Sequence, residues 1–319
     1  LRLRPRVLND VSGLDCSLEL FGQRLETPIL LAPASNHMLA HPEGELATAR
    51  GAGITKTTMI LSSAANKDIK EVVGAATSPV WFQLYAQHER ALTSDMVQHA
   101  MQSGSQALCV TIDSPVDGMR NRQTRARLKR PEGVGFPNYF GRNTTRPSLQ
   151  TLDEVRPQKL DWAEIDWLRT LTKKPLLLKG ILHPVDAVRA LEHGVDGIVV
   201  SNHGGRALDT APATIDALPD IVDAVAGRMP ILIDGGIRRG TDVLKAIATG
   251  ATAVLIGRPY IYGLAVGGAE GVAHALQILR MELLSAMALC GAASLAKLDR
   301  SILWPANGPL STRVPSGSP

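Results

Sequence analysis

Short apolar runs rich in Val, Ile and Leu alternate along the chain with longer amphipathic stretches. The apolar runs predict eight strands, at residues 29–32, 58–61, 80–84, 107–112, 176–179, 197–201, 231–234 and 253–256. Amphipathic stretches at 93–103, 184–193, 214–226 and 241–249 predict helices between them, whereas the helix between the second and third strands has only a weak signal. Strands that alternate with helices favour right-handed βαβ units, and eight such units predict a closed (β/α)₈ TIM barrel.

Residues 114–160 break this rhythm. The segment is rich in Pro, Gly, Arg and Asn and shows no hydrophobic period. Because long irregular segments inside a compact domain are usually functional, we expect a lid or mobile loop after the fourth strand. The rest of the pattern predicts one barrel domain over residues 1–319.

The composition restricts the possible partners. Hydrophobic residues make up 45% of the chain and aromatic residues only 4%, which predicts an aliphatic core of the kind that fills parallel strands. The formal net charge is +4, but no long unbroken block of Lys and Arg occurs. We therefore expect the basic residues to serve small anions and expect no nucleic-acid partner.

The three cysteines, Cys16, Cys109 and Cys290, lie far apart and show no C-x-x-C spacing. The sequence therefore predicts neither a disulfide framework nor a zinc site. No unbroken apolar run reaches the roughly 18 residues that cross a bilayer, so we expect no membrane span. Without a signal peptide at its start the chain is expected to be cytoplasmic, unless an N-terminal targeting segment precedes it.

Polar or small residues end or follow all eight predicted strands, which is where a barrel gathers its functional groups. They are Pro33, Ala34, Ser35, Ser62, Ser63, Gln83, Tyr85, Thr111, Asp113, Lys179, Ser201, Asn202, His203, Asp234 to Arg238, Gly257 and Arg258. Any one of these is ordinary, but together they predict a site that covers the whole mouth of the barrel.

Glycine and arginine follow the last two strands, in Asp234-Gly235-Gly236-Ile237-Arg238 and in Gly257-Arg258. Loops after strands seven and eight commonly form a phosphate site in this fold. Glycine lets backbone N–H groups approach phosphate oxygens, and a guanidinium binds the dianion bidentately. The glycines could instead only make tight turns, but the pair of loops favours a phosphorylated ligand or cofactor.

Lys179 and His203 are the residues most suited to redox and proton chemistry. Lys179 ends an apolar run and points either into the mouth, where it would stabilise a reduced flavin, or outward as a solvated or salt-bridged lysine. His203 lies in Ser201-Asn202-His203-Gly204-Gly205-Arg206 and is either structural or a base. Arg206, with Arg120 from the long loop, would bind a carboxylate, and Asp113 would orient the imidazole.

Taken together, these segments resemble the family of FMN-dependent 2-hydroxy acid oxidases and dehydrogenases, which includes glycolate oxidase, lactate oxidase and mandelate dehydrogenase. The most specific match is the stretch at residues 201–206. The stretch at residues 40–45, Gln83-Leu84-Tyr85, Leu178-Lys179-Gly180, the stretch at residues 234–238 and Ile256-Gly257-Arg258 match in the same order. The resemblance runs over nearly the whole chain and implies a (β/α)₈ barrel that binds FMN.

The resemblance also implies roles for individual residues. His203 would be the base, Tyr85 the partner of the substrate hydroxyl, Asp113 the partner of His203, and Arg206 with Arg120 the carboxylate anchors. The FMN contacts would come from Pro33, Ala34, Ser35, Ser62, Gln83, Thr111, Lys179, Ser201, Asp234, Gly235, Gly236, Arg238, Gly257 and Arg258. The expected reaction converts an L-2-hydroxy acid such as lactate or glycolate to its 2-oxo acid. O₂ or another acceptor would reoxidise the flavin, in a homo-oligomer expected to be a tetramer.

Several alternatives stay open at this point. The family's N-terminal segment, which carries a further substrate-binding tyrosine, is expected to be missing here, so a non-catalytic or impaired FMN or 2-hydroxy acid binding protein is one alternative. Another FMN-dependent or phosphate-binding barrel enzyme is the second. Ser35 stands where many relatives have Ala or Gly, which leaves oxidase or dehydrogenase open. The residues also do not choose between proton removal from the α-carbon and hydride transfer.

Overall fold

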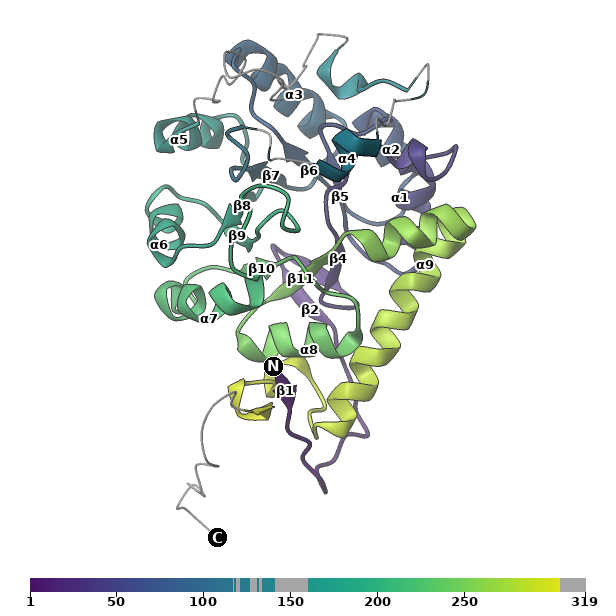
Figure 1. Cartoon of the computed structure of the whole chain (residues 1–319), viewed down its shortest axis with the longest axis vertical. Helices are drawn as coiled ribbons and strands as arrows, with labels where there is room; N and C mark the ends of the chain where they lie inside the picture. The colour runs from purple at the N-terminus through teal and green to yellow at the C-terminus, as the bar shows by residue number, and fades with distance from the viewer. Residues whose placement is uncertain (117, 119–120, 127–130, 132–133, 141–159, 305–319) are drawn as a thin grey trace.

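Eight parallel strands close into a barrel in a computed structural model that describes all residues except 117, 119–120, 127–130, 132–133, 141–159 and 305–319 (Figure 1). They are β4 (Ile29–Leu31), β5 (Met59–Ser62), β6 (Val80–Leu84), β7 (Leu108–Thr111), β8 (Leu176–Ile181), β9 (Gly197–Val200), β10 (Ile231–Ile233) and β11 (Ala253–Ile256). Each strand pairs with the next along the chain, and β11 pairs with β4 to close the ring. The predicted barrel and its eight strands are confirmed, and each strand starts or ends within two residues of the expected position.

Helices surround the barrel. They are α1 (Glu45–Ile54), α2 (Ile69–Ala75), α3 (Arg90–Gln102), α5 (Trp162–Thr170), α6 (Pro184–Glu192), α7 (Thr214–Val225), α8 (Gly240–Thr249) and α9 (Arg258–Leu289), with a short α4 (Asn121–Ala126) in the loop after β7. The four helices with a clear sequence signal are confirmed as α3, α6, α7 and α8. The weakly signalled α2 is short, and a capping box between Asp68 and Glu71 satisfies its first N–H groups.

The core has two layers, because successive residues of a strand point to opposite faces. One set fills the barrel interior and is almost entirely aliphatic, with Leu30, Ile60, Cys109, Leu177, Val199, Leu232, Leu255 and the large ring of Trp81. The alternate residues, such as Leu31 and Leu61, pack outward against the helices. The low aromatic content therefore corresponds to an interior filled by branched aliphatic side chains.

A hairpin closes the end of the barrel where the strands begin. Its strands are β2 (Leu18–Leu20) and β3 (Gln23–Leu25), and Leu20 and Leu25 belong to the interior cluster. The ring centroid of Phe21 lies 5.7 Å from that of Trp81. Near the chain ends, β1 (Arg2–Leu3) pairs antiparallel with β12 (Leu303–Trp304).

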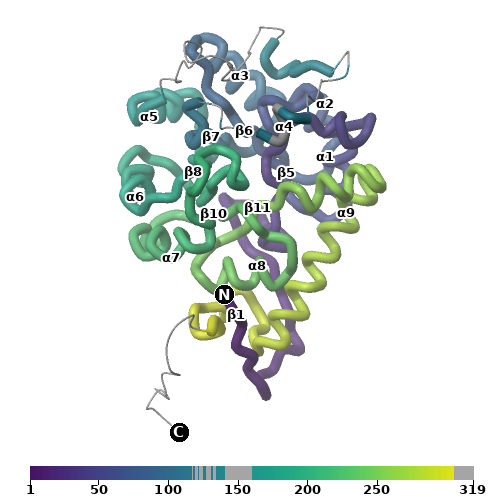
Figure 2. Tube along the Cα trace, viewed as in Figure 1, coloured from purple at the N-terminus to yellow at the C-terminus, as the bar shows by residue number. Residues whose placement is uncertain are grey.

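The helix α9 combines two helices that meet at a kink, and its trace bends in Figure 2. Gly267 and Gly268 have non-helical backbone angles at the bend. The helix packs against α1 and α8. By length and composition alone this helix could cross a membrane, but the core helix of a soluble protein passes the same test, so the expected absence of a membrane span stays a prediction.

The loop after β7 is more structured than expected. Its described parts include α4 and a short 3₁₀ helix, η2 (Pro137–Tyr139), where Asn138 and Tyr139 are buried. The expectation of a wholly irregular segment at 114–160 is therefore wrong for these stretches. The expected lid itself falls largely outside the described residues.

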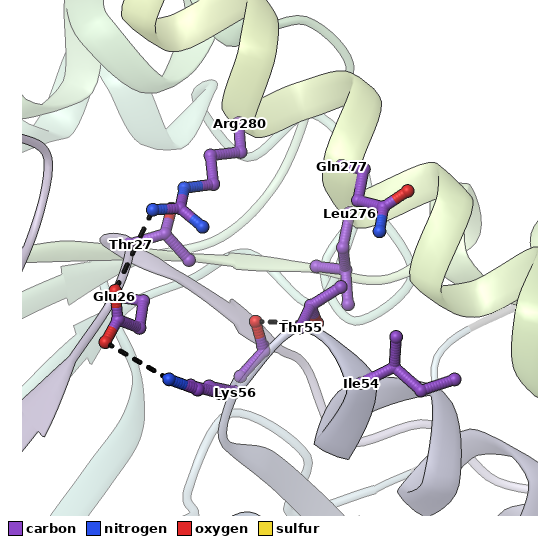
Figure 3. A pocket seen from close by; sticks show the side chains of 9 residues that line it. Glu26, Thr27, Ile54, Thr55, Lys56, Leu276, Gln277 and Arg280 are labelled. Atoms are coloured by element: carbon purple, nitrogen blue, oxygen red, sulfur yellow. Dashed lines mark hydrogen bonds and ion pairs between the residues drawn. The ribbon is translucent and has the colours of Figure 1, made fainter.

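A pocket of about 160 Å³ lies where β4 and β5 begin, at the end of the barrel opposite the polar strand ends (Figure 3). Glu26 lies between Lys56 and Arg280, with oxygen–nitrogen distances of 3.8 Å to each. Apolar contacts come from Ile54 and Leu276. Because the carboxyl ends of the strands carry the candidate chemistry, this pocket is separate from the site described below.

Candidate active site

A line of three hydrogen-bonded side chains crosses the carboxyl ends of β5, β6 and β7. The Ser62 hydroxyl donates to Oε1 of Gln83 at 3.0 Å, and Nε2 of Gln83 donates to Oγ1 of Thr111 at 2.9 Å. Ser62 and Gln83 are also register partners, and all three residues are buried. The three predicted residues therefore form one fixed polar row at the mouth.

Lys179 lies beside this row with its charge enclosed by partners. Its Nζ donates to the Ser201 hydroxyl at 2.9 Å and lies 3.1 Å from Oδ2 of Asp234. Burial on its own lowers the pKa of Lys179, but the carboxylates of Asp234 and Asp113 outweigh it and raise that pKa well above its usual value. The lysine therefore points into the mouth and stays positively charged, and the solvated alternative is wrong.

His203 forms the centre of a second cluster. Its Nδ1 lies 2.8 Å from Oδ1 of Asp113 and 3.4 Å from the Ser114 hydroxyl, and its Nε2 lies 3.4 Å from the Tyr85 hydroxyl. Burial raises the pKa of Asp113, but the hydrogen bond from His203 and the charge of Lys179 bring it below its usual range. Asp113 is therefore an anion that accepts from Nδ1–H, which leaves the Nε2 lone pair directed toward Tyr85.

Gly180 makes this arrangement possible. A Cβ at this position would lie 2.4 Å from Cβ of Asp113, and the backbone has φ +118°, a conformation that L side chains rarely adopt. The glycine also coincides with an irregularity in the pairing of β8 with β9, between Lys179 and Ile181. Thus the residue after Lys179 must be glycine for Asp113 to approach.

The glycine-rich loop after β10 lies on the same rim as His203. Asp234 is buried, and Gly235 and Gly236 follow it with φ +93° and +77°. A Cβ on Gly235 would lie 3.4 Å from Oδ1 of Asn202, next to His203, and 3.0 Å from Oγ1 of Thr214. Lys179 joins the two loops because it contacts both Ser201 and Asp234.

The remaining predicted residues line the edges of the mouth. Pro33 and Ala34 are half-buried and Ser35 is exposed after β4, while Arg238 and Arg258 are exposed and follow β10 and β11, with Gly257 half-buried at the start of α9. Arg206 is exposed, and the backbone of Gly118 lies against the carbonyl oxygens of Arg206 and Ala207. Arg120 lies outside the described residues, two positions from Gly118.

The residues present fit FMN. Among the described residues the buried Oδ1 of Asp234 has no hydrogen-bond partner, although Oδ2 of the same carboxylate binds Lys179, so a ligand hydroxyl could donate to it. A Cβ on Gly236 would meet nothing within 4 Å, so there is open space for a phosphate at this loop, near the exposed Arg238. Among the described residues no group of three His, Cys, Asp or Glu side chains could hold a metal ion.

Several contributors to this site were not predicted from the sequence. Ser114 donates its hydroxyl to Oδ1 of Asp113 at 2.9 Å, and Gly180 admits Asp113. Tyr139 contacts Ser63 at the base of the loop that carries Tyr85. Gly180 belongs to the matched stretch Leu178-Lys179-Gly180, although no role was assigned to it, whereas Tyr139 lies in a stretch without any periodic signal.

Comparisons with known proteins agree with this geometry. The family model of FMN-dependent dehydrogenases matches residues 1–305. An L-lactate oxidase of Nostoc sp. is 48% identical over 95% of this chain and 86% of its own length, and a glycolate oxidase of Spinacia oleracea is 40% identical over 98% and 86%. A mandelate oxidase variant solved with benzaldehyde has a TM-score of 0.86 at 37% identity, over 93% of this chain and 84% of that one.

Proposed function

The chain belongs to the family of FMN-dependent dehydrogenases, and from this premise we propose how its residues work. It is an FMN-dependent enzyme that oxidises 2-hydroxy acids to 2-oxo acids. The residue assignments rest on one line of contacts beside the charged Lys179. Nδ1 of His203 lies 2.8 Å from Oδ1 of Asp113, and its Nε2 lies 3.4 Å from the Tyr85 hydroxyl.

His203 is the base. With Nδ1–H held by Asp113, Nε2 is the nitrogen that takes a proton from the substrate, and the Asp113 carboxylate stabilises the imidazolium that results. Tyr85 donates to or accepts from the substrate hydroxyl, because its own hydroxyl lies 3.4 Å from Nε2. The substrate hydroxyl thus binds between these two groups.

Arg206 binds the substrate carboxylate. A guanidinium matches a carboxylate with two parallel hydrogen bonds, and Arg206 lies three residues from His203 on the same loop. Arg120 is the second anchor, as the family resemblance implies; it follows two positions after Gly118, whose own backbone lies against that of Arg206. Two guanidinium groups that bind the substrate carboxylate fix the position of the substrate α-carbon as well as the negative charge.

The mouth residues hold FMN, which supplies a two-electron acceptor when bound. Lys179 keeps a positive charge next to the site and so favours the more negative, reduced state. Asp234 accepts from a ligand hydroxyl through its free Oδ1, and Arg238, Arg258 and the glycines after β10 bind the phosphate. The polar row of Ser62, Gln83 and Thr111 completes the floor.

The substrate is a small L-2-hydroxy acid and the acceptor is O₂. The relative with 48% identity is named an L-lactate oxidase and one with 40% identity a glycolate oxidase, and both names describe oxygen-linked enzymes of small substrates. We expect the protein to form a tetramer and to be located in the cytoplasm.

An anaerobic spectroscopic screen tests the proposal. The yellow holoenzyme should bleach with L-lactate or glycolate but not with D-lactate, and admitting air should restore the colour and release one H₂O₂ per substrate. His203→Ala should keep the colour but lose bleaching, while His274→Ala, an exposed histidine on α9, should behave as wild type. A holoenzyme that no 2-hydroxy acid bleaches, or a His203→Ala variant reduced at the wild-type rate, would overturn these assignments.

A further inference from the structure

Residues 134–140, from the loop after β7, are fastened to the loop between β5 and α2. Oδ1 of Asn138 accepts from the N–H of Ile69 at 2.9 Å, and Nδ2 of Asn138 donates to the carbonyl of Lys67 at 3.0 Å. Nδ2 of Asn66 donates to the carbonyl of Gly135 at 3.1 Å. Asn138 is 1% exposed, and its bond with the N–H of Ile69 is buried, so its amide fixes the position of the segment.

The next residue, Tyr139, connects this segment to the active site. Its hydroxyl lies 3.2 Å from the hydroxyl of Ser63, and the two residues are 5% and 0% exposed. Oγ of Ser63 also accepts from the backbone N–H of Tyr85 at 3.3 Å, and the N–H of Ser63 donates to the carbonyl of Gln83 at 2.8 Å. A chain of two buried hydroxyls therefore runs from Tyr139 to the backbone of Tyr85.

This chain has a consequence for the Tyr85 side chain. Tyr85 directly follows β6, and its hydroxyl lies 3.4 Å from Nε2 of His203, at the long end of the hydrogen-bonding range. A small shift of its backbone would change the distance between the Tyr85 hydroxyl and a substrate placed against His203. Burying a tyrosine hydroxyl is unfavourable without a partner, so packing alone would favour phenylalanine at position 139.

We propose that Tyr139 is a positioning residue for the oxidation of 2-hydroxy acids: through the Ser63 hydroxyl it fixes the backbone of Tyr85, and so the place where the Tyr85 hydroxyl meets the substrate. The proposal rests on the function proposed above, in which Tyr85 binds the substrate hydroxyl. It assigns a positioning role to a residue of the loop after β7, which reaches the backbone of Tyr85 through the hydroxyl of Ser63.

The test is the steady-state kcat/KM for L-lactate of the Tyr139→Phe holoenzyme, followed as O₂ consumption. We expect kcat/KM to fall about fivefold, the size of one lost buried hydrogen bond, with FMN still bound. Tyr262→Phe makes the same chemical change on an exposed tyrosine of α9 and should leave kcat/KM unchanged. Ser63→Ala removes the second hydroxyl of this hydrogen-bonded pair and should lower kcat/KM by a similar factor. Adding Tyr139→Phe to the Ser63→Ala variant should cause no further loss.

A double-mutant cycle separates positioning from a general loss of structure. In a Tyr85→Phe background the Tyr139→Phe change should have no further effect on kcat/KM, because the hydroxyl that it positions is gone. An equal fivefold loss in both backgrounds would overturn the proposal, as would an unchanged Tyr139→Phe enzyme. If no 2-hydroxy acid reduces even the wild-type flavin, the proposed function fails and the role of Tyr139 with it; failure of Tyr139→Phe alone leaves that function standing.

Discussion

Replacing Asp113 with Asn tests how the histidine is prepared for proton transfer. Asp113 is an anion 2.8 Å from Nδ1 of His203, and the two side chains are 9% and 12% exposed. An asparagine would present an amide that can donate to Nδ1. The imidazole would then carry its proton on Nε2, facing Tyr85, and could no longer accept one from the substrate.

The magnitude follows from the charge that is removed. Two unit charges about 4 Å apart at an effective dielectric constant of about 20 interact by roughly 4 kcal/mol. Each 1.4 kcal/mol, roughly, corresponds to a tenfold change in rate, so losing this stabilisation of the imidazolium reduces the rate by up to about a thousandfold. Part of the loss is recovered by water or by rotation of the ring, so we expect a reduction of about a hundred- to a thousandfold.

Stopped-flow measurement of anaerobic flavin reduction by L-lactate gives this rate directly, with FMN absorbance as a check that the cofactor is retained. Asp166→Asn is the matched control, because Oδ1 of Asp166 lies 2.6 Å from Nδ1 of His193 on the surface of α5 and α6. That variant should reduce its flavin at the wild-type rate. An Asp113→Asn enzyme within tenfold of wild type would refute the role given to the carboxylate.

Three further outcomes follow from the same structure. Lys179→Met leaves the Asp234 carboxylate buried without its cation, so we expect a loss of about 3 kcal/mol or more in urea unfolding, together with slower flavin reduction; a variant as stable as wild type would contradict the buried pair. Gly180→Ala places a Cβ 2.4 Å from that of Asp113 at φ +118°, so flavin reduction in this variant should slow as in Asp113→Asn. Gly194 also has a positive φ but lies in open space, so Gly194→Ala should change stability alone. Burial lowers the pKa of His37 from 6.5 to about 3, so below pH 6.5 the unfolded chain binds a proton that the folded chain does not, and stability falls as the pH falls. His37→Gln should flatten this slope by up to about 1.4 kcal/mol per pH unit between pH 6 and pH 4 in denaturant titrations, and an unchanged slope would show that the folded protein accepts the proton.

The barrel could be predicted because its information is local and repeated. Each strand, such as 80–84 or 253–256, is a short aliphatic run, and the fold places all polar residues that follow such runs on one rim. The positions of Lys179, His203 and Asp234 at the mouth follow from this rule without knowledge of any long-range contact. The pairing of His203 with Asp113 was also expected, and the structure brings their atoms to 2.8 Å.

Contacts that depend on irregular backbone could not be predicted in the same way. Tyr139 lies in a segment without periodicity, and its contact with Ser63 joins residues 76 positions apart. The kink at Gly267 and Gly268 in α9 and the structured stretch at Pro137–Tyr139 likewise depend on tertiary packing. Hydrophobic patterns report which face of an element is buried, but they do not report which buried hydroxyls meet.

The charges at the mouth form one coupled set, which explains why the site needs so many buried ionic groups. Lys179 lowers the pKa of Asp113, and both Asp113 and Asp234 raise the pKa of Lys179, so Lys179 and Asp113 keep each other charged despite burial. The Asp113 carboxylate is then negatively charged beside His203, and the Lys179 ammonium is positively charged beside the cofactor site. The Asp113 carboxylate interacts with both His203 and Lys179. Proton transfer at His203 and electron acceptance beside Lys179 therefore depend on the same set of charges, which lie at the carboxyl ends of β7, β8 and β10.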